Sequence, residues 1–518
     1  MDIQNTEKTK RIAKNTVYLY GRMLFGMLVS LYTSRVILNA LGVVDFGIQN
    51  VVGGLVSMFS LISSALSSSI SRFITFELGT GNEKKLRAVF STSLLIQIGL
   101  GIVVLLIAET VGLWFLNNRM VIPADRLYAA NWIFQASVVS FIIGLLSCPY
   151  NALLVAYERM NIFAYFGILN IFLNLAIVLF VAYAPFNFDK LIVYSISLMA
   201  VGFIVQFFLW RYCFKHFAES HELPRFYKRS WKEMSGFAGW NAIGCTAGIL
   251  KDQGVNVLIN IFFGPAVNAA RGIAGSVSTA VGSFSGNFLT AVSPQITKSY
   301  ATKDHEYLFM LVERSSRFGF YLLLCIALPI LLETRFVLTL WLKTVPEYAV
   351  IFVKLTLFCS LLEILSSSLI TLQIATGKIR DYQIAVGGLL LMNFPACWLA
   401  LKLGAQPWVV YVIAFVIGIG CMLLRLWFLR KMVGLSMRAY LKKVVLNVSV
   451  TAAVSVVVPA LVFFSLSEGF PRLVSVVLVS MVSTAGCTLY IGCTSGERSF
   501  LLSKFKVVAL KLSPSSSR

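Results

Sequence analysis

The chain has 518 residues, of which 58% are hydrophobic and only 13% are charged, about half the charged share usual for soluble domains. Its net charge of +22 would suit a nucleic-acid-binding protein, but the basic residues lie mainly in short segments between long apolar runs. These properties exclude a soluble enzyme or nucleic-acid-binding module and indicate a protein that crosses a membrane many times.

Apolar runs of about 20 residues, long enough to cross a bilayer as helices, recur along the whole chain. We predict an all-α polytopic fold of about 14 transmembrane helices. The predicted spans are 17–41, 47–70, 88–116, 129–154, 162–183, 191–213, 237–262, 267–292, 308–332, 347–373, 382–401, 408–428, 444–466 and 473–494.

The basic residues are distributed unevenly over the segments between these spans. Most of them fall on one side if the N-terminus is cytoplasmic, with clusters at 72–87, 211–232 and 425–443. Short loops rich in lysine and arginine stay in the cytoplasm. The pattern therefore predicts that both termini and the basic linker 214–236 are cytoplasmic.

Residues 36–95 and 258–317 repeat the same pattern of small and polar residues at a shift of 222. The matched pairs are Gly42 and Gly264, Gly53 and Gly275, Ser57 and Thr279, Ser63 and Ser285, Ser71 and Ser293, Thr75 and Thr297, and Thr80 and Thr302. A looser match, at a shift of 219, pairs 156–160 with 375–379. Duplicated sets of spans are typical of secondary transporters, whose substrate site lies between the halves.

The shift covers six predicted spans, an even number, so the repeats are expected to be parallel rather than inverted. We predict an N-lobe at 1–213 (spans one to six) and a C-lobe at 237–430 (spans seven to twelve), joined by the linker 214–236. Residues 431–518 hold spans thirteen and fourteen and the tail, and have no counterpart in the first lobe. We therefore expect the two-lobe core to insert without spans thirteen and fourteen.

Ionisable residues within spans are costly to insert and are functional candidates by default. They concentrate in the duplicated helices, which carry Arg22, Arg35, Arg72, Lys251, Asp252 and Arg271. Asn241, Asp252 and Asn256 fall on one stripe of the seventh span at about 100° per residue. The sequence thus predicts a mainly cationic cavity walled by spans one, two, seven and eight, which would select an anion such as a phosphate.

Several of these residues also have simpler interpretations. Arg72 and Arg35 lie toward span ends and could extend to lipid headgroups. Asp252 could neutralise its basic neighbours or couple an ion. Glu109, Lys354, Glu363 and Arg425 also touch spans but lie outside the duplicated pair, and we interpret them as interfacial or structural.

Little in the sequence points to catalysis or to a bound metal. The nine cysteines form no C-x-x-C pair, and His216, His221 and His305 all fall in predicted loops. No phosphate-binding G-x-x-x-x-G-K-[ST] motif occurs. We therefore predict a non-enzymatic protein with no catalytic residues, cofactor or metal site.

A turn after the first span reads Leu41-Gly42-Val43-Val44-Asp45-Phe46-Gly47-Ile48. It resembles the Leu-Gly-x-x-x-acid-Phe-Gly pattern of polysaccharide flippases in the MATE/oligosaccharidyl-lipid/polysaccharide (MOP) exporter superfamily. Gly79-Thr80-Gly81-Asn82 and the segment 375–382 agree with this resemblance, which extends over the whole chain.

The resemblance implies a Wzx-type flippase in the bacterial inner membrane. Such proteins move undecaprenyl-diphosphate-linked oligosaccharide repeat units to the outer leaflet for O-antigen, capsule or exopolysaccharide assembly by alternating access. By position, the cationic cavity residues of such relatives correspond to Arg22, Arg35, Arg72, Lys251 and Arg271.

Implied partners are the anionic lipid-linked oligosaccharide, membrane lipids, a coupling ion, and the polymerase and glycosyltransferases of the pathway, but no nucleic acid. The alternatives are a multidrug or cation antiporter of the same superfamily, a lipid II flippase and, from another class, a membrane-bound polymerase or ligase.

Overall fold

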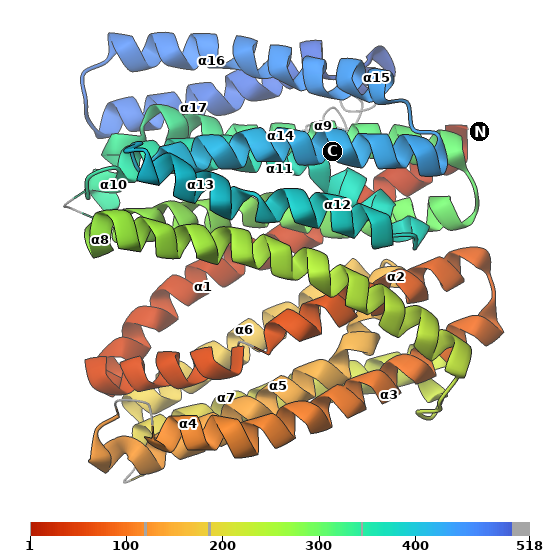
Figure 1. The fold of residues 1–518 in the computed structure, drawn as a ribbon, viewed down its shortest axis with the longest axis vertical. Coiled ribbons are helices and arrows are strands. Elements are labelled where there is room, and N and C mark those ends of the chain that lie inside the picture. Colours follow the sequence, from red (N-terminus) through yellow and green to blue (C-terminus); the bar gives the residue numbers. More distant parts are fainter. Residues whose placement is uncertain (1, 58, 119–121, 185–187, 343–344, 500–518) are drawn as a thin grey trace, which may run out of the picture. The chain divides into compact units, whose positions relative to one another are not determined.

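The computed structural model describes residues 2–57, 59–118, 122–184, 188–342 and 345–499, and every regular element in these ranges is a helix (Figure 1). This confirms the predicted all-α fold. The elements of the first half are α1 (Asp2–Ser57), α2 (Ser60–Thr80), α3 (Glu83–Ile107), a π-helical turn (Ala108–Gly112), α4 (Leu113–Asn118), a 3-10 turn (Ala124–Arg126), α5 (Leu127–Ala156), α6 (Met160–Tyr183), α7 (Lys190–His216), a second 3-10 turn (Ala218–His221) and α8 (Lys228–Ala301).

The second half is also built entirely from helices over its described residues. Its elements are α9 (His305–Leu332), α10 (Thr334–Leu342), α11 (Ala349–Thr376), α12 (Arg380–Leu391), α13 (Asn393–Lys402), α14 (Val409–Val433), α15 (Met437–Tyr440), a π-helical turn (Leu441–Leu446), α16 (Asn447–Ser465), α17 (Phe470–Cys487) and a second π-helical turn (Thr488–Gly492).

Ten helical segments are long and apolar enough to cross a membrane, counted over the described part of the chain. Each coincides with one of the spans predicted from the sequence. The other predicted spans fall on α1, α2 and α8. The protein is therefore a multi-pass membrane protein.

The helix α1 contains a sharp bend at Gly42, whose φ of 81° and ψ of 169° are accessible only to glycine. The acidic residue of the following motif, Asp45, is buried and forms an ion pair with Arg126, which also pairs with Asp189 (Nη1 to Oδ2, 2.6 Å). Beyond it, Ile48 and Val52 pack in a core with Phe134 of α5. The motif thus bends α1 at Gly42, and the ion pair and the apolar contacts hold the segment after the bend against α5.

The long helix α8 must reverse direction, although its backbone hydrogen bonding is helical throughout. The Nη2 of Arg271 donates to the backbone oxygen of Asp252 at 3.1 Å. These residues are 19 positions apart, which would separate them by about 28 Å along a straight helix. The reversal between them divides α8 into the two antiparallel passes predicted at 237–262 and 267–292.

The sequence repeat is also a repeat of backbone conformation. Gly81 and its counterpart Lys303 both adopt a left-handed conformation, with φ of 70° and 59°. In the looser match, Glu158 and Gly377 do the same, with φ of 57° and 74°. Because left-handed backbone is uncommon outside glycine, four such residues at matched positions support a structural duplication.

Two matched residues of the repeat also touch each other. A Cβ on Gly79, near the end of α2, would lie 3.0 Å from the Cβ of Ala301, at the end of α8. These positions are equivalent at the shift of 222. This contact brings the ends of the two matched helical segments together within unit 1.

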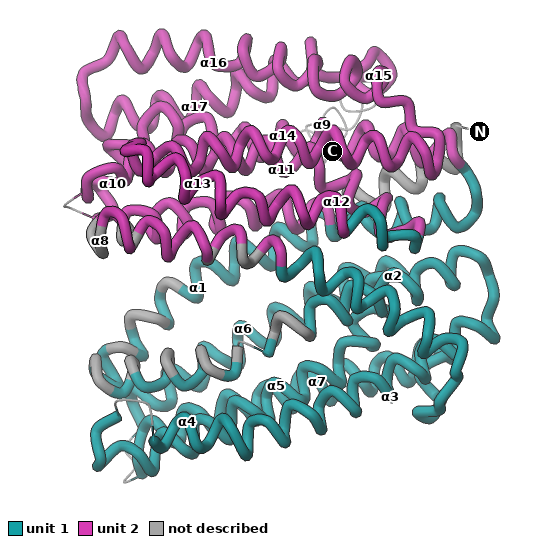
Figure 2. The backbone as a smooth tube through the Cα atoms, viewed as in Figure 1, with its two compact units in different colours: residues 1–246, 290–304, 377–383 teal, residues 247–289, 305–376, 384–518 magenta. Residues whose placement is uncertain are grey.

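The chain divides into two compact units (Figure 2). Unit 1 comprises residues 1–246, 290–304 and 377–383, and unit 2 comprises 247–289, 305–376 and 384–518. In unit 1, α5 packs against α7, α2 and α3, and α1 packs against α6. In unit 2, α11 packs between α9 and α14, and the α16–α17 pair packs on α9.

Candidate functional site

Unit 2 contains a polar hollow walled by α8, α11 and α14. One part has a volume of about 460 Å³ and the adjoining part about 270 Å³. Both parts are lined by Lys251, Asp252, Cys359, Glu363 and Ala414. We call the two parts together the central cavity.

Lys251 lies between two carboxylates in this cavity. Its Nζ is 3.5 Å from Oε1 of Glu363 and 3.8 Å from Oδ1 of Asp252. The lysine side chain is 18% exposed, whereas those of Glu363 and Asp252 are 70% and 67% exposed. These ion pairs are weak, because the distances are long and the carboxylates are exposed to solvent. An entering anion can therefore compete for the ammonium group.

Arg271 enters the same cavity from the second pass of α8. Its guanidinium donates to the backbone oxygen of Asp252, and its Cζ lies 5.6 Å from the ring centroid of Tyr411. The hydrogen bond and the cation–π contact fix the side chain on the cavity wall. A planar fork held in this way can recognise a phosphate or carboxylate with two parallel hydrogen bonds.

The remaining walls present small and hydroxyl-bearing side chains. Ser278 and Ser360 share a hydrogen bond of 3.0 Å between their hydroxyl oxygens, which ties α8 to α11. Thr279 and Asn393 line the larger part, and Ser366 and Ser367 line the smaller part. Such a lining can hydrogen-bond a hydroxylated guest.

The predicted polar stripe of the seventh span is divided between the two units. Asn241, in unit 1, is 5% exposed; its Nδ2 donates to the backbone oxygen of Ala65, and its Oδ1 accepts from Gln383 (both 3.3 Å). These bonds join helices within that unit. Asn256 lies in unit 2, and the central cavity is lined next to it by Val255.

Arg22 lies where α1 packs against α6. Its Cζ is 4.7 Å from the ring centroid of Phe163. Gly167 leaves room for the arginine stem, since a Cβ there would lie 2.3 Å from its Cδ. Gly167 therefore accommodates an arginine inside a membrane span. The described contacts of Arg22 are with an aromatic and a small residue.

Arg72 is surrounded by aromatic rings. Its Cζ lies 4.4 Å from the ring of Phe73, 4.7 Å from that of Phe76 and 5.7 Å from that of Phe237. Its Nη2 would be 2.4 Å from a Cβ on Gly377. The side chain of Arg35 lies outside the described residues.

Glu363 and Arg425, for which the sequence favours an interfacial or structural role, both line the central cavity. A signal was present in the sequence. Cys359, Glu363, Ser366, Ser367 and Ile370 follow one helical face of α11 at spacings of three and four. The cavity therefore holds three cations and two acids, a more balanced set than the sequence predicted.

Known proteins resemble this chain both in sequence and in structure. No protein-family model matches the chain. An uncharacterized membrane protein EpsK of Bacillus subtilis (strain 168) is 22% identical over 496 residues, covering 93% of this chain and 96% of the relative.

Similar solved structures are membrane transporters. A MATE protein in a straight conformation aligns with a TM-score of 0.70 at 13% identity, covering 83% of this chain and 97% of the other. An outward-facing multidrug resistance MATE family transporter aligns at 0.68 with 12% identity, covering 82% and 96%. A MOP superfamily transporter from Pyrococcus furiosus Vc1, noted for a binding pocket of reverse polarity, aligns at 0.67 with 14% identity and the same coverages. The chain has the fold of the MATE and MOP superfamily transporters.

Proposed function

We propose that this protein is a flippase of the bacterial inner membrane that translocates an undecaprenyl-diphosphate-linked oligosaccharide repeat unit by alternating access. The observation that carries the proposal is the central cavity, in which Lys251 and Arg271 present cations among hydroxyl-bearing walls. A diphosphate cannot enter hydrocarbon without compensating charge and hydrogen bonds, and these residues supply both.

In this mechanism the two cations have different roles. Arg271, fixed on Tyr411, grips the diphosphate as a fork. Lys251 adds a mobile point charge when the diphosphate replaces Glu363 as its partner. The prenyl tail stays in lipid and the sugars occupy the hydroxyl-lined space. Arg22 and Arg72 of unit 1, with Arg35, are proposed to serve the same substrate, and Asp252 to take part in ion coupling.

The test is complementation of glycan export in a strain lacking its own flippase, with protein amount measured by immunoblot. Arg271→Ala and Arg22→Ala should nearly abolish export, and Arg271→Lys should reduce it clearly because the two-pronged geometry is lost. Lys251→Arg should be milder. Arg438→Ala, an exposed arginine outside the cavity, is the matched control. Full export by both alanine variants at normal protein levels would overturn the proposal.

A second candidate is a multidrug or cation antiporter of the same superfamily. The observation in its favour is the pair of carboxylates, Asp252 and Glu363, in the cavity. Against it, Lys251 and Arg271 would repel a cationic drug. Cation export in a drug-sensitive strain that disappears in Asp252→Asn and Glu363→Gln would favour this candidate.

A further inference from the structure

Unit 1 contains two segments from the second half of the chain. They are residues 290–304, which end α8, and residues 377–383, which follow α11 (Figure 2). By the sequence-based division both belong to the C-lobe, whereas most of unit 1 is the N-lobe. Each segment lies at the end of an even-numbered predicted span, so the predicted topology places both on the cytoplasmic side. The contacts that hold them therefore join the two predicted lobes at this side of the membrane.

A buried ion pair holds the end of α8. The side chain of Glu158, in the loop after α5, is 1% exposed. Its Oε1 lies 2.8 Å from Nζ of Lys298, and its Oε2 accepts a hydrogen bond from Nε2 of Gln295 at 2.7 Å. Gln295 and Lys298 are three positions apart and therefore share one face of the helix. We call these three residues the lobe latch.

A glutamate at position 158 is unfavourable for the backbone. The amide of Arg159 donates to the backbone oxygen of Leu154 at 2.9 Å, which closes a type of helix end that usually carries glycine. Glu158 has a left-handed φ of 57°, and its matched position in the second repeat, Gly377, is a glycine. Strain of this kind persists where the side chain makes contacts that offset it, and here these are the contacts of the latch.

Apolar contacts complete the junction around the latch. Ala291 of α8 is fully buried in a core with Leu19 of α1 and Met160 of α6. Further along α8, the Cβ of Ala301 would lie 3.0 Å from a Cβ on Gly79 of α2. The end of α8 thus meets α1, α2 and α6 of the predicted N-lobe as well as the loop after α5.

The matched loop of the second repeat makes the reciprocal contact. Gly377, in the loop after α11, lies against Arg72 of α2, since a Cβ there would be 2.4 Å from Nη2 of the arginine. The loops at Glu158 and Gly377 are paired by the sequence repeat, as are α2 and the second pass of α8. Each repeat therefore places its loop on the second span of the other repeat, and these contacts join lobes.

The latch is suited to an interface that opens and closes. When its ammonium and carboxylate groups separate into water, both are rehydrated, so they add no large penalty to the open state. Replacing Lys298 alone instead removes the ammonium partner of the buried Glu158 carboxylate, which is costly in the closed state only. Such a change shifts the equilibrium toward the open state, because it acts on one state and not on the other.

We propose that the lobe latch closes the predicted cytoplasmic side of the transporter and that its separation admits the substrate from that side. This rests on the alternating access of the proposed function, in which the two sides open in turn. Glu158 acts as a positioning residue, since it holds the end of α8 and is not among the residues that line the central cavity. The ion pair with Lys298 sets how often this side opens.

The first experiment measures opening without a substrate. Ala291→Cys is introduced into a chain whose nine native cysteines are replaced, and the full-length protein in lipid nanodiscs is reacted with a water-soluble maleimide. The thiol should react slowly when the latch is intact, because Ala291 is buried. Lys298→Gln should accelerate labelling about tenfold or more. Exchanging the charges, by Glu158→Lys with Lys298→Glu, should slow labelling again, which general loss of folding cannot produce.

Two controls separate opening from general destabilisation. Lys85→Gln removes the ammonium group 2.9 Å from the buried Glu77, a pair within the predicted N-lobe, and should leave labelling of the Ala291→Cys thiol unchanged. A chain that keeps only Cys397, which is fully buried in unit 2, should label slowly in every latch variant. The latch would be overturned if Lys298→Gln labels as slowly as Lys85→Gln. Fast labelling of Cys397 in Lys298→Gln would also overturn it, because Lys298 would then serve folding.

The second experiment locks the junction in the complementation strain. Gly79→Cys with Ala301→Cys places two thiols within reach of a disulfide. Diamide should abolish glycan export, and dithiothreitol should restore it. The matched control is Ala247→Cys with Gly387→Cys, whose Cβ atoms would lie 3.7 Å apart within the predicted C-lobe, and it should export in both conditions.

The failure of the latch and the failure of the proposed function give different results. Undiminished export by the cross-linked Gly79→Cys/Ala301→Cys protein would overturn the latch. Absence of glycan export in the wild type would contradict the proposed function instead, and the labelling of the Ala291→Cys thiol would still report whether the latch controls opening.

Discussion

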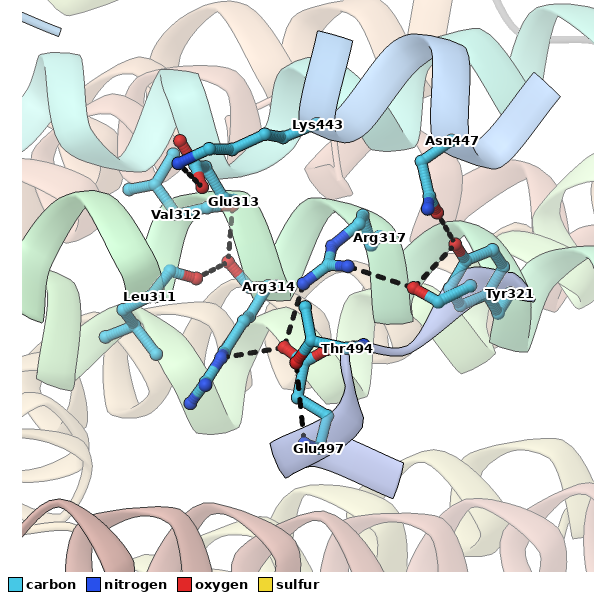
Figure 3. Close-up of polar contacts among 12 residues, drawn as sticks. Leu311, Val312, Glu313, Arg314, Arg317, Tyr321, Lys443, Asn447, Thr494 and Glu497 are labelled. Atoms are coloured by element: carbon cyan, nitrogen blue, oxygen red, sulfur yellow. Dashed lines mark hydrogen bonds and ion pairs between the residues drawn. The ribbon is translucent and has the colours of Figure 1, made fainter. Parts of the chain in front are cut away.

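Unit 2 contains two groups of charged residues that behave in opposite ways. In the central cavity, Lys251 lies 3.5 Å from a carboxylate whose side chain is 70% exposed. In the second group, Arg317 and Glu497 are 9% and 6% exposed and pair at 2.8 Å (Figure 3). Arg317 also donates to the backbone oxygen of Gly492 at 2.9 Å, and Arg314 Nε lies 2.8 Å from the same carboxylate.

The contrast separates ions that hold the fold together from ions that can change partners. A buried charge is tolerated only when its hydrogen bonds are nearly all satisfied, so breaking such a pair is costly. A hydrated pair at a long distance contributes little stability and can be replaced by a ligand. We call Arg317–Glu497 the tail clasp.

The tail clasp also changes the expectation for the C-terminal spans. A second ion pair joins the half-buried Arg472 of α17 to the buried Glu333, just after α9, through Nε–Oε1 (2.6 Å) and Nη2–Oε2 (2.9 Å) contacts. The hydroxyl of Tyr440 donates to the backbone oxygen of Leu365 at 2.6 Å. These contacts attach the C-terminal segment to the interior of unit 2, and we therefore expect the core to depend on it.

The largest effect is expected from truncation after Lys443. It would remove Arg472, Gly492 and Glu497 together and leave Arg317 and Glu333 buried without these partners. We expect severe loss of folded protein, measured as the monodisperse fraction in size-exclusion chromatography of the solubilised chain. A truncated protein as abundant and monodisperse as wild type would restore the sequence-based expectation that these spans are separable.

A smaller loss of stability is expected from Glu497→Gln. It leaves Arg317 in place without its countercharge and should destabilise unit 2 by about 3 kcal/mol. The measurement is thermal unfolding in detergent. The control is Glu468→Gln, which changes an exposed residue in the loop between α16 and α17 and should leave the stability unchanged. Adding Arg317→Met to Glu497→Gln should recover part of the lost stability, because it removes the unpaired buried charge. A double variant less stable than Glu497→Gln alone would count against the clasp.

In the central cavity, Glu363→Gln should change binding rather than stability. Removing the carboxylate nearest Lys251 makes the cavity more cationic. Pyrophosphate should therefore bind a few-fold more tightly by titration calorimetry, and more so at low salt. Glu306→Gln, an exposed acid at the start of α9, serves as the control. Weaker pyrophosphate binding by Glu363→Gln would show that the carboxylate supports the anion site instead of competing with it.

The smallest effect is expected from Arg72→Lys. An arginine that only extended to lipid headgroups could be replaced by lysine almost without loss, but three aromatic rings surround the Arg72 guanidinium. An ammonium group keeps the charge and loses the stacking of the planar group. We expect a destabilisation of about 0.5–1 kcal/mol and export close to wild type. A severe export defect at unchanged stability would instead assign Arg72 a direct role in transport.

The sequence alone determined the features that depend on local pattern. Apolar runs set the helical spans, and the duplication predicted matched turns, since Gly81 and Lys303 share a left-handed conformation. The cost of placing charge in a membrane identified Lys251, Asp252 and Arg271 as candidates, and these three do line one cavity.

Only the tertiary structure decided which distant residues complete each group. Glu363 is 112 positions from Lys251, and Glu497 is 180 from Arg317. The sequence indicates that a charge within a span needs a partner. Which residue becomes that partner depends on the contact of α11 with α8 and on the packing of the C-terminal segment around α17 against α9. In unit 1, Asn241 likewise obtains its partners from other helices, the backbone oxygen of Ala65 on α2 and the amide of Gln383 on α12. A local pattern cannot encode these choices, because they depend on helices brought together by the burial of their other faces.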